Sequence, residues 1–305
     1  METEFLDWLR ERLPSHPNLR LGIGDDAAVL DLGMRPECVV TVDLITEGVD
    51  FRLSETSPQR IGHKALAVNL SDLAAMAARP LAAVVALALP RVGALETAVG
   101  LYQGLLPLAE RYNLAIAGGD TNTWDGPLVV SVTALGQVTQ RGVLRRAGAR
   151  PGDALVVTGE FGGSILGKHL DFEPRVREAL ALHERYELHA GMDVSDGLSL
   201  DLSRLAEASG CGAVLYLSRV PVAKEAYELA RLRGDSVSPL DHALGDGEDF
   251  ELLLAVPPLD ALRVTTDKSI GTPLTTVGQF VEQPGLWQLH PSGELLPLEP
   301  RGYLH

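Results

Sequence analysis

The segment Gly22-Ile23-Gly24-Asp25-Asp26-Ala27-Ala28-Val29 places two adjacent carboxylates behind two glycines and directly before an apolar stretch. Adjacent carboxylates repel each other, so holding both in a partly buried loop is costly unless a cation neutralises them. Alone, the pair would be an ordinary solvated turn. Further aspartates, however, lie in apolar or glycine-rich surroundings at Asp43, Asp72, Asp120, Asp193 and Asp196. The question for the fold is whether these acids converge on one site.

The composition limits the classes of function. A chain of 305 residues is long enough for about two domains, and its formal net charge of −15 argues against nucleic-acid or anionic-membrane partners. The two cysteines lack CxxC spacing, which is typical of a reducing compartment. The longest apolar run, residues 81–90, is too short to span a membrane. These features predict a cytoplasmic protein with no membrane partner.

The first half alternates predicted helices and strands. After an amphipathic helix over residues 4–13, a β-branched strand at 39–43 ends in Asp43, where a rigid element would aim a ligand group. Ser57-Pro58 predicts the start of a helix that runs to about residue 79. Its middle is apolar nearly all round except for Asn69, Ser71 and Asp72, and Lys64 is a distant candidate partner for Asp72.

The alternation continues to the end of the chain. A glycine turn around 118–120 is expected to end the strand that begins at residue 114, and a polar, Gly/Pro-rich stretch at 145–153 predicts a boundary between domains 1–148 and 149–305. Further strands are predicted at 81–89, 128–138, 154–158, 213–217, 250–256 and 275–280, and helices at 95–112, 161–170, 174–186, 198–209 and 223–232. The pattern predicts two mixed α/β domains of similar size.

One stretch has the spacing of a phosphate-binding loop. Gly162-Gly-Ser-Ile-Leu-Gly167-Lys168-His169 follows a predicted strand, but a P-loop needs Ser or Thr after the lysine to bind Mg²⁺. His169 occupies that position, so tight strand-to-helix packing is the favoured interpretation. The acids are more informative, because carboxylates suit Mg²⁺ and no His/Cys cluster suits zinc or iron. The residues alone favour a site with several Mg²⁺ ions for a polyphosphate ligand.

Five blocks occur in an order that identifies a family resemblance. They are Gly22 to Leu30, Lys64 to Met76, Gly118-Gly-Asp-Thr121, Asp193-Val-Ser-Asp-Gly-Leu198 and Gly247-Glu-Asp-Phe-Glu-Leu252. The whole chain resembles the thiamine-monophosphate kinases, which belong to the aminoimidazole ribonucleotide synthetase-like superfamily. The resemblance implies a two-domain α/β fold whose N-terminal domain forms a barrel across a homodimer. It also implies transfer of a phosphate from ATP to thiamine monophosphate, with several Mg²⁺ ions.

The resemblance also implies roles for individual residues. The metal-binding set comprises Asp25, Asp26, Thr41, Asp43, Asp72, Asp120, Asp193 and Asp196. The ATP contacts are Gly119, Asp120, Arg146 and Ser195, and the groups at the reaction centre are Asp120, Arg146 and Asp196. The substrate contacts are Asp50, Glu248 and Tyr303. Because a phosphomonoester acceptor has a second pKa of ~6, its oxygen is anionic at neutral pH and no general base is expected.

Two residues depart from the family pattern. Val42 stands where a hydroxyl residue is usual, which removes a possible metal oxygen, and Asp50 stands where His is usual, which bears on the choice of acceptor. Two alternatives therefore stay open: a related kinase or synthetase with another small phosphate acceptor, and a Mg-nucleotide-binding protein without turnover. Selenophosphate synthetase and the hydrogenase maturation protein are disfavoured, because Cys38 is the first cysteine and the tail ends Gly-Tyr-Leu-His305.

Overall fold

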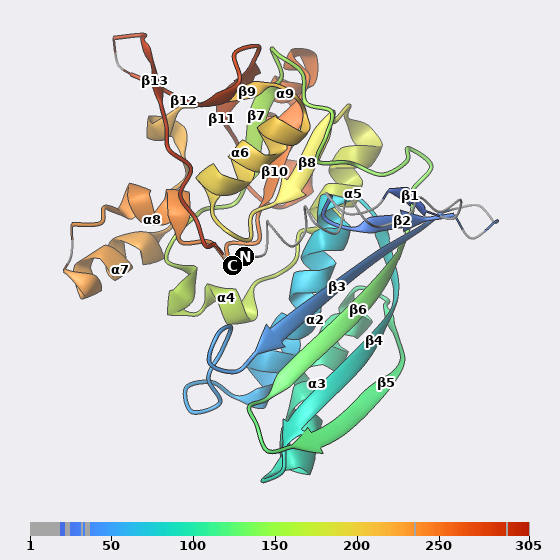
Figure 1. Cartoon of the computed structure of the whole chain (residues 1–305). Helices are drawn as coiled ribbons and strands as arrows, with labels where there is room; N and C mark the ends of the chain where they lie inside the picture. Colours follow the sequence, from blue (N-terminus) through green and yellow to red (C-terminus); the bar gives the residue numbers. More distant parts are fainter. Residues whose placement is uncertain are drawn as a thin grey trace, which may run out of the picture.

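The computed structural model describes residues 19–21, 25–31, 33, 37–234, 236–290 and 292–304. The predicted helix at 4–13 and the glycines at 22 and 24 lie outside this part of the chain. The described residues form two mixed sheets with helices packed against them (Figure 1). The fold class predicted from the sequence, mixed α/β, is confirmed.

The N-terminal sheet has six strands in the order β1-β2-β3-β6-β4-β5. Only β4 and β5 pair in parallel, and the other neighbours are antiparallel. The strands are β1 (Leu19–Leu21), β2 (Ala28–Leu30), β3 (Cys38–Thr46), β4 (Arg79–Pro90), β5 (Ala115–Trp124) and β6 (Val129–Gln137). The side chains of β3 and β6 alternate between a buried and a more exposed face, as the period of two along a strand requires.

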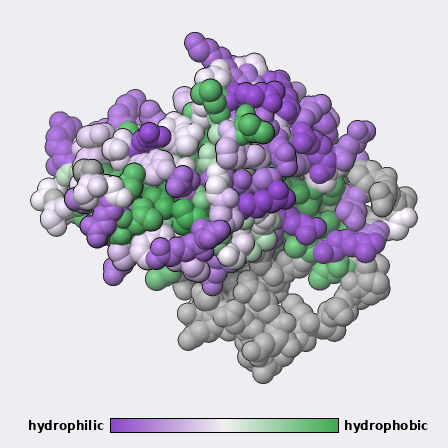
Figure 2. Space-filling model, turned by 90° about the horizontal axis from the view of Figure 1, so that it is seen from above, coloured by the Kyte–Doolittle hydropathy of each residue, from purple (hydrophilic) through white to green (hydrophobic). Residues whose placement is uncertain are grey.

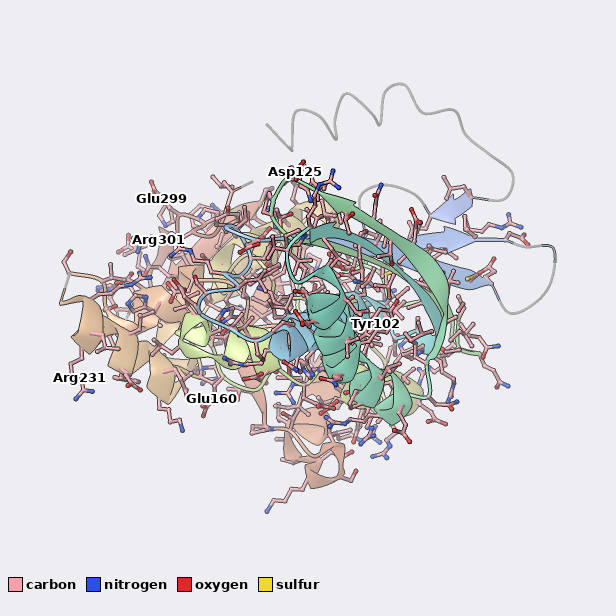
Figure 3. The ribbon with its side chains drawn as sticks, turned by 90° about the horizontal axis from the view of Figure 1, so that it is seen from below. Tyr102, Asp125, Glu160, Arg231, Glu299 and Arg301 are labelled. Carbon is pink, nitrogen blue, oxygen red and sulfur yellow. The ribbon has the colours of Figure 1, made fainter. Side chains whose placement is uncertain are left out.

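Helices α2 (Pro58–Ala75) and α3 (Ala94–Arg111) pack against each other beside this sheet, as the view from below shows with Tyr102 on α3 (Figure 3). The predicted start of α2 is confirmed, because the Ser57 side chain accepts a hydrogen bond from the Arg60 amide and proline occupies the first turn. The two helices cross in close contact. A Cβ on Gly62 would lie 1.9 Å from the Leu101 carbonyl oxygen.

The other face of the sheet has no helix over it among the described residues. Val42 and Leu44 of β3 are 62% and 61% exposed, and Val84 of β4 is 40% exposed. Paired residues on neighbouring strands point to the same face of a sheet. One such row crosses β3, β6, β4 and β5 and consists of Leu44, Ser131, Ala86 and Asp120. The sheet therefore carries an open face with apolar side chains on β3 and β4.

The predicted glycine turn at 118–120 is wrong. Strand β5 continues through these residues to Trp124, with a register shift opposite Ala83 and Val84, and Gly118 adopts φ +141° inside the strand. Asp120 is consequently an exposed residue in the middle of an edge strand.

The C-terminal sheet has seven strands in the order β13-β12-β9-β11-β7-β10-β8. The strands are β7 (Ala154–Thr158), β8 (Ala190–Asp193), β9 (Gly212–Leu215), β10 (Leu252–Val256), β11 (Leu274–Val281), β12 (Gly285–Leu289) and β13 (Leu295–Pro297). The helices are α4 (Lys168–Asp171), α5 (Val176–Arg185), α6 (Leu198–Ala208), α7 (Lys224–Arg233), α8 (Pro239–Gly245) and α9 (Pro258–Thr266), with short 3₁₀ turns at Ser164–Leu166, Leu217–Arg219 and Lys268–Ile270.

Two hydrophobic cores hold these layers together. The larger core joins the N-terminal sheet, α2 and α3 to α5 and one face of the C-terminal sheet, including Phe172 stacked on Phe250. The smaller core lies on the other face of the C-terminal sheet, beneath α6 and α8. Seen from above, the outer surface is mostly hydrophilic with hydrophobic residues in a few patches (Figure 2). No described helix is long and apolar enough to cross a bilayer.

Candidate metal and phosphate site

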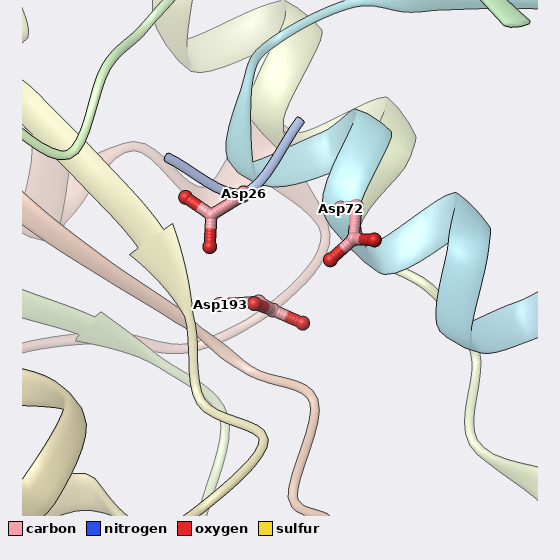
Figure 4. A group of neighbouring side chains, drawn as sticks. All are labelled: Asp26, Asp72 and Asp193. Carbon is pink, nitrogen blue, oxygen red and sulfur yellow. The ribbon is translucent and has the colours of Figure 1, made fainter. Parts of the chain in front are cut away.

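Three carboxylates from distant parts of the chain point toward one another (Figure 4). Asp26 precedes β2, Asp72 lies on α2 and Asp193 ends β8, and one oxygen from each lies within 4.8 Å of the others. A buried helix, a strand end and a loop therefore aim three negative charges into one small volume. Such an arrangement is stable at neutral pH only with cations or protons between the carboxylates.

The electrostatics of the cluster show this strain. Burial and the charges of Asp43 and Asp193 raise the pKa of Asp72 well above its usual value, and burial with the charge of Asp26 does the same to the pKa of Asp193. Burial raises the pKa of Asp43 to about 6. Among the described residues, Oδ2 of Asp26 and Oδ2 of Asp43 are buried without a hydrogen-bond partner. These two oxygens are available to a cation.

Hydroxyl donors orient two of the acids. Thr41 of β3 donates its hydroxyl to Asp72, and Ser71, beside Asp72 on α2, donates its hydroxyl to Asp193. Both serine and threonine hydroxyls are buried, with their residues 1% and 6% exposed. Each hydrogen bond links an element of the N-terminal sheet region to the cluster, so the carboxylates are held in fixed orientations before any ligand arrives.

Arg146 lies at the edge of the cluster and pairs with the opening motif. Its guanidinium donates to Asp26 Oδ1 at 2.7 Å, and its amide approaches both oxygens of Asp25 at 3.2 Å. Burial and the neighbouring charge of Asp26 raise the pKa of Asp25 to about 6. The Nε of Arg146 is buried without a partner in the described chain. Arg146 therefore holds one buried N–H beside the carboxylates that donates to no partner in the described chain.

The predicted residues Ser195 and Asp196 lie in the turn between β8 and α6. Asp201, in the first turn of α6, accepts the amides of residues 195, 196 and 197 at 3.1, 2.9 and 3.2 Å. Arg204 donates to both Asp196 and Asp201. Because Asp201 occupies these amides, the α6 N-terminus presents the side chains of Ser195 and Asp196 instead of free backbone donors.

The predicted substrate residues gather around the same turn. The Glu248 amide donates to the Ser195 carbonyl at 2.6 Å, and the Tyr303 amide donates to the Asp196 carbonyl at 2.9 Å. The C-terminal tail is fixed there, because the Arg301 amide donates to the Ser199 hydroxyl, and its guanidinium donates to Asp241 (Arg301 is labelled in Figure 3). Tyr303 is 52% exposed beside this turn.

Asp50 is engaged within its own loop. Its carboxylate accepts the Thr46 amide at 2.7 Å, which closes the turn after β3. Its carbonyl accepts a hydrogen bond at 3.1 Å from Lys64, which also forms an ion pair with Glu248. Lys64 thus joins two residues that the family resemblance connects with the acceptor, and it does not pair with Asp72 as the sequence allowed.

Two predicted residues lie apart from the cluster in a single chain. Gly119 and Asp120 are on edge strand β5, and the strands β6 and β4 separate them from Asp43 on β3. Asp120 is in line with Leu44 on the open face of the sheet, whereas Thr41 and Asp43 lie on the side of α2. Their predicted contacts with ATP and metal remain predictions.

The departure at position 42 has a geometric interpretation. Val42 alternates with Thr41 and Asp43 along β3, so its side chain points to the open face, and it is 62% exposed. A hydroxyl in its place would also point away from the cluster. The valine therefore removes no side-chain oxygen from the carboxylate cluster of this chain.

In the loop that resembles a P-loop, carboxylates of the protein already accept the hydrogen bonds that a phosphate would accept. The Gly162 amide donates to the Asp249 carboxylate at 3.0 Å, and Lys168 pairs with Glu251 at 3.0 Å. His169 is buried, with Nδ1 2.8 Å from the Ser164 carbonyl oxygen. Since carboxylates already accept its donors, this turn has no phosphate-binding role in the described structure.

Sequence reasoning missed the residues that support the site: Asp201 and Arg204 behind the Ser195 turn, and Asp249 and Glu251 in the segment that leads into β10. The sequence did contain a recognisable pattern for Asp201 and for Glu251. Asp201 stands in the first turn of a helix after a glycine, a common position for an amide-accepting carboxylate, and Glu251 alternates with apolar residues in a buried segment.

The residues present fit Mg²⁺. The donors are carboxylate oxygens, two of them are buried without partners, and the cluster offers no soft ligand among the described residues. Asp26, Asp43, Asp72 and Asp193 would hold the ions.

Comparisons with known proteins place this geometry in a class. Residues 24–138 match the AIR synthase related protein N-terminal domain, and residues 150–286 match the corresponding C-terminal domain. The thiamine-monophosphate kinase of Rhodopirellula baltica is 46% identical over 312 residues and covers 100% of this chain and 97% of its own length.

Two solved structures are similar to this chain over nearly its whole length. The thiamine-monophosphate kinase of Stenotrophomonas maltophilia has a TM-score of 0.76 and 34% identity, with coverage of 95% of this chain and 96% of its own. A structure described as AaThiL complexed with AMPPCP and TMP has a TM-score of 0.78 and 27% identity, covering 99% and 96%.

The fold and the acid cluster thus define an AIR synthase related protein of two domains. Within that class, the chain belongs to the thiamine-monophosphate kinase family.

Proposed function

We propose that this chain transfers the γ-phosphoryl group of ATP to the phosphate of thiamine monophosphate, giving thiamine diphosphate and ADP. The observation that carries the proposal is the convergence of Asp26, Asp72 and Asp193, whose charges are compensated only in part by the protein. The family to which the chain belongs supports the acceptor. AaThiL was solved with AMPPCP and TMP, which we take as an ATP analogue and thiamine monophosphate.

We further propose that several Mg²⁺ ions bind at the cluster, where they would screen the repulsion between two anionic phosphates. The protein's own contribution is orientation. Thr41 and Ser71 fix the carboxylates of Asp72 and Asp193, and the buried Nε of Arg146 keeps one N–H unpaired beside them within the described chain. The acceptor oxygen is already anionic at neutral pH, so the reaction needs alignment and charge compensation and no side-chain base.

We also propose that the protein works as a homodimer. The open face of the N-terminal sheet exposes Val42, Leu44 and Val84, and a second copy is the occupant that the predicted barrel requires. Asp120 lies on this face, so its part in the site would depend on the dimer. Leu44→Glu is expected to convert a dimer to a monomer in light scattering. A wild-type monomer would overturn this proposal.

The family and two free cysteines support a cytoplasmic location.

The test of the activity is ADP release with and without thiamine monophosphate, in the presence of Mg²⁺. Stimulation by thiamine monophosphate, with thiamine diphosphate as the product, is expected. An ATPase rate that does not respond to thiamine monophosphate would refute the proposed function. A response to another phosphomonoester alone would indicate a related kinase.

A further inference from the structure

Lys64 is a lysine enclosed between the two halves of the molecule. Its side chain is 1% exposed, and it lies on α2 two turns before Asp72. The ammonium group donates to the Asp50 carbonyl at 3.1 Å and to Oε1 of Glu248. A buried lysine is stable only when such partners compensate its charge. Because it is closed off, Lys64 can influence a ligand only through the groups that it holds.

The partner, Glu248, lies in a loop with unusual backbone geometry. Glu248 and Phe250 have φ of +54° and +51°, in the left-handed region that residues other than glycine seldom adopt. The Phe250 amide donates to the Val194 carbonyl at 2.8 Å, and the Glu248 amide donates to the Ser195 carbonyl at 2.6 Å. The loop is thus fixed against the turn that follows Asp193, and strained loops of this kind often serve a ligand site.

The ion pair leaves one side of the Glu248 carboxylate available. The side chain is 34% exposed, and its Oε2 atom has no hydrogen bond within the described parts of the chain. An ionised carboxylate can only accept hydrogen bonds, so a group that meets Oε2 must be a donor. Lys64 fixes the direction of that acceptor by holding Oε1.

Helix α2 therefore connects two ends of one site. Lys64 and Asp72 are separated by about 12 Å along the helix, at 1.5 Å per residue. Asp72 belongs to the cluster that would carry the phosphates, and Lys64 holds the carboxylate at the opposite end. A rigid helix keeps this spacing constant, which suits an acceptor with a phosphate at one end and a hydrogen-bond donor at the other.

We propose that Lys64 is a positioning residue for acceptor specificity, which orients Glu248 toward a hydrogen-bond donor on the end of the acceptor away from its phosphate. This inference rests on the proposed function. For thiamine monophosphate, the donor is the exocyclic amino group of the pyrimidine ring. Asp50 takes part through its carbonyl, which holds Lys64, and its carboxylate closes the turn.

The test compares Lys64→Met, Lys64→Arg, Glu248→Gln and the double variant Lys64→Met/Glu248→Gln. Lys224→Met is the matched control, because Lys224 is 89% exposed on α7. Lys64→Met should raise the KM for thiamine monophosphate about tenfold to a hundredfold, the usual cost of a hydrogen bond to a charged group, with the KM for ATP nearly unchanged. Lys64→Arg should recover part of the loss, and the double variant should be no worse than Glu248→Gln.

A second readout uses oxythiamine monophosphate, in which a carbonyl replaces the amino group. Wild type should prefer thiamine monophosphate by at least about a hundredfold, because the analogue offers no donor of the same kind to Oε2. Lys64→Met should reduce this preference about tenfold, both in turnover and in calorimetric binding of the two acceptors. A residue with a merely structural role would lower both affinities together and leave their ratio unchanged.

The outcomes separate the two proposals. Failure of wild type to use thiamine monophosphate would refute the proposed function. If the wild type is active, three results would each overturn the role of Lys64. The first is an unchanged preference of Lys64→Met for thiamine monophosphate over oxythiamine monophosphate. The others are an equal rise of the KM values for thiamine monophosphate and ATP, and additive losses in the double variant. If Lys64→Met does not fold, the pair Lys64→Arg and Glu248→Gln gives the same comparison of preference, because the Arg variant retains the buried charge.

Discussion

Two groups of buried acids in this molecule have opposite surroundings. Just before β10, Glu251 accepts two hydrogen bonds of 2.7 Å from Arg175, one of 3.0 Å from Lys168 and one of 2.8 Å from Thr158. Although burial opposes it, these partners lower the pKa of Glu251. At the cluster, Asp43 is half-buried, its Oδ2 is buried without a partner in the described chain, and burial raises its pKa to about 6.

The degree to which the protein compensates a buried carboxylate separates a structural acid from a functional one. Glu251 is compensated by the protein itself, so its charge stabilises the native fold and needs no ligand. The protein compensates the negative charges of the cluster acids only in part. The native fold therefore holds these charges at a cost in stability, as functional sites often do. Variants of single acids and of their hydrogen-bond donors test this contrast.

The largest effect is expected for Asp72→Asn. Turnover should fall by at least about a thousandfold, because the amide cannot neutralise a cation. The melting temperature of the metal-free protein should stay the same or rise, because the change removes repulsion from Asp43 and Asp193. Steady-state kinetics and calorimetry measure the two quantities, with the exposed Asp125→Asn as control. Turnover like that of wild type would contradict the assignment of Asp72 to the site.

Glu251→Gln should show the reverse pattern. Without this carboxylate, the positive charges of Arg175 and Lys168 lose their partner. The free energy of unfolding should fall by about 2–3 kcal/mol, after allowance for the partial exposure of these two side chains. The activity per folded molecule should change little. Urea unfolding monitored by circular dichroism measures the loss, and Glu228→Gln on the surface of α7 is the control. A fully stable variant would show that the network is not structural.

Ser71→Ala removes the hydroxyl that orients Asp193. Loss of such a supporting hydrogen bond should weaken the apparent Mg²⁺ affinity about tenfold or somewhat more, with a smaller effect on stability. A Mg²⁺ titration of ADP release measures the affinity, and the exposed Ser218→Ala is the matched control. An unchanged Mg²⁺ requirement would mean that Asp193 needs no orientation by α2.

The smallest effect concerns the pH dependence of the metal-free protein. Since the folded pKa of Asp43 is about 6, above its ordinary value of 3.8, the folded state binds its proton more tightly than the unfolded state. Its contribution is therefore favourable at low pH and is lost as the pH rises through 6. Relative to Asp43→Asn, wild type should lose about 1 kcal/mol between pH 5 and pH 7.5 in EDTA, or about 2 °C in melting temperature. A constant difference between the two proteins would show that Asp43 is not strained.

Several features were correctly predicted from local pattern. Ser57-Pro58 begins α2 as expected, and the β-branched run before Asp43 lies in β3. The prediction that Asp43 ends this strand is wrong, because pairing with β6 keeps β3 extended to Thr46. These elements depend on neighbours in the sequence, where capping and side-chain alternation operate. The glycine turn at 118 was wrong because pairing with β4 keeps β5 extended past the glycines, and no local pattern reports on a strand partner.

Residue type and local pattern identified the candidate acids, the position of Asp72 in a buried helix, and the family to which the chain belongs. Which of these residues meet depends on tertiary packing. Ser71 orients Asp193 and Arg146 pairs with Asp26 across more than a hundred residues, Lys64 pairs with Glu248 instead of serving Asp72, and Asp120 lies on the opposite face from Asp43. The reason is physical, because such contacts depend on how sheets and helices pack, while residue type and spacing constrain only the nearest turns of the chain.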